Sequence, residues 1–190
     1  MRTSALLILL SLSFLAPSLH SAQSEVIAEL KTSLFQAANA ALKSANEARA
    51  ALLSPTNYSE GAENYRRAED ILERGGNIDT IRRDLERAEK AFLKSAEQAA
   101  LAATTFGSAI GARDDAMSAN AEAYAADVWR EAEITFNEAA VRLEKGRLER
   151  AQKEGSQAEN QFREAELIAI KANYLNETRN LLCLLYTSPS

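Results

Sequence analysis

The chain is poor in the residues that build most catalytic and metal sites. Its 190 residues contain one histidine, His20, and one cysteine, Cys183. His20 lies in an N-terminal segment that we expect to be removed, so the mature chain would have no histidine. It could then form neither a Ser-His-Asp nor a Cys-His site, and it would lack the ligands that zinc, copper and iron prefer. The sequence predicts no metal site and no cofactor.

Acidic residues do not change this interpretation. The adjacent carboxylates Glu69-Asp70 and Asp114-Asp115 could in principle act as acid and base. Charged neighbours on a helix surface are much the commoner case. We therefore predict no catalytic residue and a chain that is not an enzyme.

Signals of nucleic-acid and phosphate binding are also missing. The net charge is -5 and the cations are scattered, whereas phosphate backbones bind clustered cations. The doublets Arg66-Arg67 and Arg82-Arg83 are interpreted as solvated helix faces, with a phosphate or partner contact as the alternative. Arg74-Gly75-Gly76 lacks the Lys-Ser/Thr of a phosphate loop. Nucleic acid is not expected as a partner.

The N-terminus has the order of a secretory signal peptide. Arg2 precedes an apolar stretch from Ala5 to about Ala16, and small residues follow. This order predicts export and cleavage after Ala22 or Ser24, with an uncleaved N-terminal anchor as the alternative. No later apolar run approaches the roughly 20 residues of a membrane-spanning helix. We expect a periplasmic mature chain without a stable membrane span.

An internal repeat is visible in the residue spacing. The steps run three, four, three, four, three in two sets: Tyr58, Gly61, Tyr65, Ala68, Leu72, Gly75 and Trp129, Ala132, Phe136, Ala139, Leu143, Gly146. Each residue of the second set lies 71 positions after its counterpart. After a one-residue deletion, matched sets follow from Ile78 and from Leu148. A tandem duplication of about 70 residues is predicted.

These spacings describe helical seams. Positions three and four apart share a helix face, and strict alternation is the seam of a coiled-coil-like pair. Trp129, Tyr65 and Phe162 could stack on a ligand, but they lie on these seams, so core packing is predicted. An upstream helix has the same rhythm at Ile27, Leu30, Leu34, Ala37, Ala41, Ser44, Ala48 and Ala51.

The predicted fold is all-α, an elongated helical bundle or a short superhelix built from the two repeats. Helices are expected near residues 25–53, 57–75, 78–106, 109–121, 125–146 and 148–182. Ser54-Pro55 should end the first helix, and Asn57 should cap the second. Gly75-Gly76-Asn77 should combine a helix stop with the next N-cap.

Two family resemblances rest on residues 129–175. The Ala/Glu/Arg-rich hairpin beginning at Trp129 resembles an uncharacterised family of bacterial envelope proteins, often found ahead of OmpA-like peptidoglycan-binding domains. The resemblance covers about residues 40–182. The same segment is similar to a degenerate tetratricopeptide repeat, because Gly146, Ala151 and Ala158 match the turn glycine and two alanines of that pattern. Gly155, however, stands where a large aromatic residue is usual, and the repeat is about twice as long.

The last eight residues, from Cys183 to Ser190, resemble the translation of a sequencing adapter. We therefore expect three segments: a signal peptide at 1–24, a repeated hairpin domain at 25–182 and a non-native tail at 183–190. The alternative is a genuine frayed tail. Cys183 is accordingly not interpreted as a disulfide partner or a reactive thiol.

The envelope resemblance implies a non-enzymatic periplasmic scaffold or spacer, the N-terminal part of a longer protein. Other envelope proteins would be its partners, and peptidoglycan would be reached only through a missing C-terminal domain. The alternative is a tetratricopeptide-like adaptor that binds a partner peptide in its concave groove. A groove lined by Asn, Lys and Arg would favour the adaptor, and a sealed seam with mixed charge would favour the spacer.

Overall fold

The structure is a computed structural model that describes the backbone of residues 18–187 and the side chains of 31–183 and 186. In this part every element is an α-helix: α1 (Ser18–Glu47), α2 (Ala50–Leu53), α3 (Pro55–Glu73), α4 (Ile78–Thr105), α5 (Gly107–Ser118), α6 (Ala121–Tyr124), α7 (Ala126–Glu144) and α8 (Leu148–Thr187). The predicted all-α class is confirmed. Most of the predicted signal peptide, residues 1–17, lies outside the described residues.

The chain divides into two units, residues 1–36 and 37–190. The second unit carries the helical bundle. No helix in the described part of the chain is long and apolar enough to cross a membrane.

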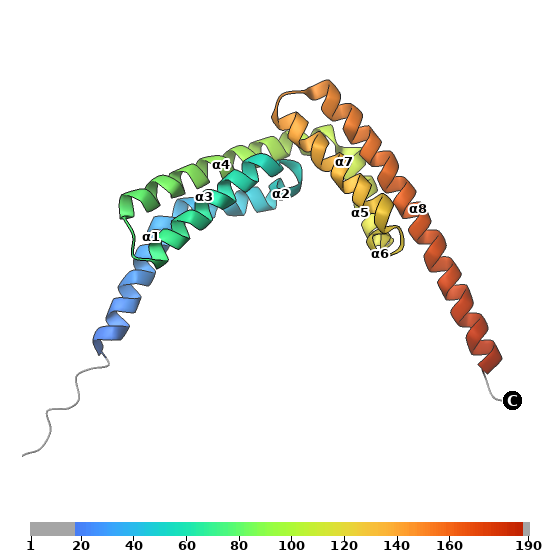
Figure 1. Cartoon of the computed structure of the whole chain (residues 1–190), viewed down its shortest axis with the longest axis horizontal. Coiled ribbons are helices and arrows are strands. Elements are labelled where there is room, and N and C mark those ends of the chain that lie inside the picture. Colours follow the sequence, from blue (N-terminus) through green and yellow to red (C-terminus); the bar gives the residue numbers. More distant parts are fainter. Residues whose placement is uncertain (1–17, 188–190) are drawn as a thin grey trace, which may run out of the picture. The chain divides into compact units, whose positions relative to one another are not determined.

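Two helical hairpins dominate the second unit. In Figure 1, α3 lies beside α4 and α7 lies beside α8, and α5 also packs along α8. The hairpin turns contain Gly75 and Gly146 at φ 64° and 69°, a conformation that suits glycine. The Asn77 side chain accepts hydrogen bonds from the amides of Asp79 at 2.8 Å and Thr80 at 3.2 Å. The predicted helix stop and N-cap between α3 and α4 are confirmed.

Two predicted helices are each interrupted once. The helix expected at 25–53 breaks at Arg49, and the helix expected at 109–121 breaks at Asn120. Both residues have left-handed backbone angles, φ 55° and 61°. A residue in this conformation cannot continue a right-handed α-helix, so the helix ends there. An ion pair with Asp114, 3.1 Å from the guanidinium nitrogen, accompanies the unfavourable conformation of Arg49.

Boundaries differ slightly elsewhere. The helix expected at 57–75 runs from Pro55 to Glu73, and the last helix continues past residue 182 to Thr187. Residues 183–187 of the predicted tail therefore belong to α8, and residues 188–190 lie outside the described part. The assignment of residues 183–190 as a non-native tail stays a prediction from the sequence.

The seams of the two hairpins form most of the core as predicted, but their residues Ile78 and Leu148 are exposed. Ala68, Leu85, Phe92, Phe136 and Phe162 are all buried. Alanine makes up much of the remaining buried surface, so the helix backbones approach closely around a few large aromatic side chains.

The predicted register of the upstream helix is partly wrong. Ala41 is buried and Ala48 half-buried as predicted, and the side chains of Ile27 and Leu30 lie outside the described part. Ala37, Ser44 and Ala51 are exposed, whereas Ala38 and Ala45 are buried in their place. The prediction was misled because runs such as Ala40-Ala41 and Ala50-Ala51 offer apolar residues on several faces. Alanine alone does not select a face.

The two hairpins correspond in their local geometry. Helices α3 and α7 each contain 19 residues, and they begin 71 positions apart. The left-handed residues Arg49 and Asn120 are separated by the same interval. The duplication itself stays a prediction from the sequence.

Candidate functional site

Glu144, the last residue of α7, joins the two hairpins. Its Oε1 accepts hydrogen bonds from the Ser54 hydroxyl at 2.6 Å, the Asn57 side-chain amide at 2.7 Å and the Asn57 backbone amide at 3.0 Å. Its Oε2 accepts from the Thr56 backbone amide at 3.2 Å. One carboxylate of the second hairpin thus binds the first turn of α3 in the first hairpin.

This arrangement follows from the sequence at the start of α3. Ser54 stands at the N-cap position, but its hydroxyl donates to Glu144 instead of capping the helix. Pro55 at the first helical position has no amide hydrogen. The first-turn amides that remain have no acceptor within their helix, and the helix N-terminus favours a negative charge. Glu144 therefore acts as an N-cap supplied by another helix.

The surroundings of Glu144 keep it ionised. Burial raises the pKa of the carboxyl, but the hydrogen bonds from Ser54, Thr56 and Asn57 outweigh that effect and hold the pKa below its usual value. Hydrogen bonds to a charged acceptor are stronger than those between neutral groups. The joint is therefore polar and charge-assisted.

Asn57 has a different role from the one predicted. Instead of capping α3 it lies within the helix, and it is only 5% exposed. Its side-chain amide donates to both Glu144 and the Ser54 hydroxyl, at 2.7 and 3.1 Å. The capping prediction failed because the acceptor needed at this helix end comes from α7, which local sequence spacing cannot show.

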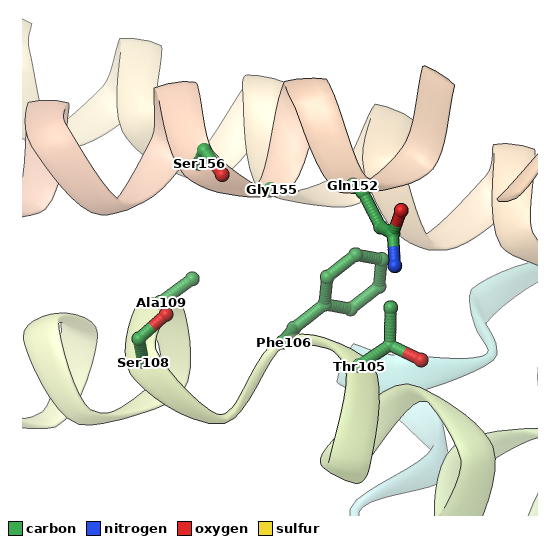
Figure 2. A pocket seen from close by; sticks show the side chains of 7 residues that line it. All are labelled: Thr105, Phe106, Ser108, Ala109, Gln152, Gly155 and Ser156. Atoms are coloured by element: carbon green, nitrogen blue, oxygen red, sulfur yellow. The ribbon is translucent and has the colours of Figure 1, made fainter. Parts of the chain in front are cut away.

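A second contact at the joint places Phe106 against α8. A Cβ atom added at Gly155 would lie 2.7 Å from Cδ1 of the Phe106 ring, and Phe106 is only 2% exposed. Figure 2 shows the ring pointing at the α8 backbone between Gly155 and Gln152. Gly155, which departs from the tetratricopeptide pattern, thus leaves the space that the Phe106 ring occupies.

The crevice around this contact is small. Its volume is about 240 Å³, below the roughly 300–1,000 Å³ typical of ligand pockets. Its lining consists of Thr105, Phe106, Ser108, Ala109, Gln152, Gly155 and Ser156. A larger hollow of about 710 Å³ at the α7–α8 turn is lined by one continuous stretch, residues 146–150. Neither hollow resembles a groove for an extended peptide.

The aromatic side chains form a continuous row through the second hairpin. Ring centroids are 5.7 Å apart for Phe106 and Phe136, 6.2 Å for Phe136 and Phe162, and 5.3 Å for Phe162 and Trp129. The predicted core packing of Trp129 and Phe162 is confirmed. Tyr65 is half-buried, and its hydroxyl donates to Asn39 Oδ1 at 2.6 Å.

Of the two acidic pairs considered as acid and base, Asp114-Asp115 forms ion pairs with arginines of other helices. Asp114 pairs with Arg49, and Asp115 accepts from Arg163 at 2.7 Å. Glu69 and Asp70 lie half-buried on α3. Within the described residues, no group of three or more His, Cys, Asp and Glu side chains is placed to hold a metal ion. The arrangement supports helix packing and ion pairing.

The joint was missed in the sequence, although one signal pointed to it. Glu144 has a counterpart at Glu73, but Ser54 and Asn57 correspond to Ala125 and Val128. Polar residues at only one of two matched positions indicate a contact made once. No protein-family model, curated protein or solved structure matches this chain.

Proposed function

We propose that this chain is a non-enzymatic helical scaffold or spacer of the bacterial cell envelope. The observation that carries the proposal is the packed and hydrogen-bonded joint between the hairpins. Glu144 caps α3 from α7, and Phe106 closes the adjoining apolar contact over Gly155. A spacer must hold its two segments in one fixed relative position. This joint can do so, because it combines a charge-assisted helix cap with a packed aromatic ring.

Surface charge supports the same proposal. Several exposed cations pair with acids one helical turn away, as Arg67 does with Glu63 and Arg130 with Asp127. Such pairs give a mixed surface and each adds little stability. The adaptor alternative needs a groove lined by Asn, Lys and Arg, and the small crevice beside Phe106 lends it little support.

Location and anchoring in this proposal rest on the sequence. The N-terminal segment predicts export to the periplasm, and the envelope resemblance implies partners among envelope proteins. Contact with peptidoglycan would be made through a C-terminal domain beyond this chain.

Spin-label distances would test the spacer. Labels at Glu86→Cys on α4 and Asn160→Cys on α8, with Cys183→Ser, should give one narrow distance distribution that solubilised envelope proteins leave unchanged, when the labelled chain is diluted with excess unlabelled chain so that only distances within one copy are measured. A broad or multiple distribution would contradict a spacer. A shift on adding peptides or envelope proteins would favour the adaptor.

Cell fractionation would test the location independently. Full-length chain expressed in a Gram-negative bacterium should appear in the periplasmic fraction, with an N-terminus at Gln23 or Glu25 by mass spectrometry. An uncleaved chain in the cytoplasm would remove the envelope part of the proposal. The spin-label result would still stand.

A further inference from the structure

The outer face of α8 carries large apolar side chains that its own bundle leaves open. Leu167, Ile170, Tyr174 and Leu181 are 52%, 50%, 70% and 63% exposed. Their steps of three, four and seven residues place them on one face of the helix. An exposed apolar face of this kind usually marks an interaction site.

The fold itself does not require apolar residues at these positions. The matching positions on α4, 70 residues earlier, are Glu97, Ala100 and Thr104, and all three are exposed. At these exposed positions the first hairpin thus has small or polar residues, whereas the second hairpin has Leu, Ile and Tyr. α4 also exposes Leu93 and Leu101, but not at the positions that match Leu167, Ile170 and Tyr174, so the repeat does not account for these three residues of α8.

We propose that a second copy of this chain covers this face, with the two α8 helices parallel and in register. Leu167, Tyr174 and Leu181 take the a positions of a two-stranded seam, and Ile170 takes a d position. Identical a residues then meet across the pair. The inference goes beyond the scaffold role, because it adds a self-association site to it.

Charge selects the parallel orientation. Glu166 and Lys171 occupy the flanking g and e positions, which face each other between copies in a parallel pair. Lys171 is exposed and forms no ion pair with any residue of the described chain. Glu166 pairs with Arg163. Arg163 also binds Asp115, so it keeps an ion-pair partner when the Glu166 side chain turns toward the second copy. In an antiparallel pair, Lys171 would instead lie near Lys171 of the other copy, and the like charges would repel each other.

One polar residue interrupts the seam. Glu177 takes the second d position, where a polar side chain lowers stability while fixing the register. Thr178 lies beside it on the same face. The seam is therefore short, and we expect a dimer that dissociates on dilution.

Sedimentation equilibrium would test the dimer. The chain without its predicted signal segment, carrying Cys183→Ser, should associate as a dimer at about 100 µM. Adding Ile170→Glu and Tyr174→Glu together should weaken association by at least about tenfold, which corresponds to about 1.4 kcal/mol of binding. Ala100→Glu and Thr104→Glu, at the matching positions of α4, should leave it unchanged.

A helical circular dichroism spectrum in every variant would show that the bundle is intact. A monomeric parent at about 100 µM, or an Ile170→Glu/Tyr174→Glu variant that still dimerises, would overturn the proposal.

Single cysteines would test the orientation. With Cys183→Ser present, Leu181→Cys should form a disulfide-linked dimer on mild oxidation, and so should Leu167→Cys, because identical a positions face each other. Cross-linking only in a mixture of the two variants would show an antiparallel pair and overturn the parallel assignment. Absence of any cross-link would overturn the seam.

Discussion

At the scale of single residues, Glu144 shows how a helix end can depend on a side chain far away in sequence. Ser54 and Pro55 leave the first turn of α3 without a cap of its own, and the carboxylate supplies the acceptor. A buried donor that loses its acceptor costs more than the bond contributes when formed. The joint should therefore be sensitive to changes at this one position.

Replacing Glu144 by alanine should lower the free energy of unfolding by about 1–3 kcal/mol, because amides and a hydroxyl at the α3 terminus lose their acceptor. Urea unfolding followed by circular dichroism would measure the change. Glu73→Ala is the matched control, since Glu73 is the exposed counterpart at the end of α3. An equal loss in both variants would show that Glu144 is not a special contact.

The same carboxylate should make stability depend on pH. Its pKa is lowered in the folded chain, so its contribution is complete above the unfolded value of about 4.3 and is lost as pH falls through the folded pKa. The difference in unfolding free energy between the parent chain and Glu144→Gln should therefore be constant near neutral pH and shrink below pH of about 4. A difference that does not change with acid would contradict the assignment.

At the scale of helices, glycine and alanine decide how closely neighbours approach. Gly155 receives the Phe106 ring, and Gly61 receives Phe92 in the same way, because a Cβ added at either glycine would lie 2.7 Å from Cδ1 of the ring. Each large ring is thus paired with an empty position on the facing helix. Removing that space should be costly, because packed interiors accommodate extra atoms poorly.

Gly155→Ala should destabilise the chain by about 1–3 kcal/mol through overpacking against Phe106. Thermal unfolding would measure the loss, and Phe106→Leu in the same chain should recover part of it. Gly111→Ala is the control, because nothing lies within 4 Å of an added Cβ there. Alanine in that helix should instead stabilise by about 0.5–1 kcal/mol. A neutral Gly155→Ala would show that the ring moves aside freely.

At the scale of the whole molecule, both hairpins contribute to one core. The buried cluster runs from Ala41 in α1 through Phe92 and Phe106 to Ala169 in α8. A shared core makes partial unfolding expensive, because opening one hairpin exposes apolar surface of the other.

Residues 37–182 should therefore unfold in a single transition. Fluorescence of Trp129, which lies in the second hairpin, and hydrogen exchange of α3 and α4 should report the same midpoint in urea. Two separate midpoints would show that the hairpins are independent units. The measurement is free of interference from other tryptophans, because the chain contains only one.

The sequence by itself determined the helical class, the hairpin turns and the seam of large residues. A 3-4 spacing with Phe92, Phe136 and Phe162 at its knobs allows only one buried face, and Gly75 and Asn77 act through local backbone geometry. Where the seam is nearly all alanine, the face predicted from the sequence was wrong at Ala37, Ser44 and Ala51. Alanine buries too little area to mark one.

Only the tertiary structure decided how the hairpins join. The Glu144 cap on α3 and the Phe106 ring over Gly155 connect residues dozens of positions apart. Local propensity carries no information about such partners. The helix breaks at Arg49 and Asn120 were also not predicted from the sequence, because neither residue is glycine, which takes the left-handed conformation most readily. The sequence thus specifies each helix through its period, while the joint depends on which ends meet in space.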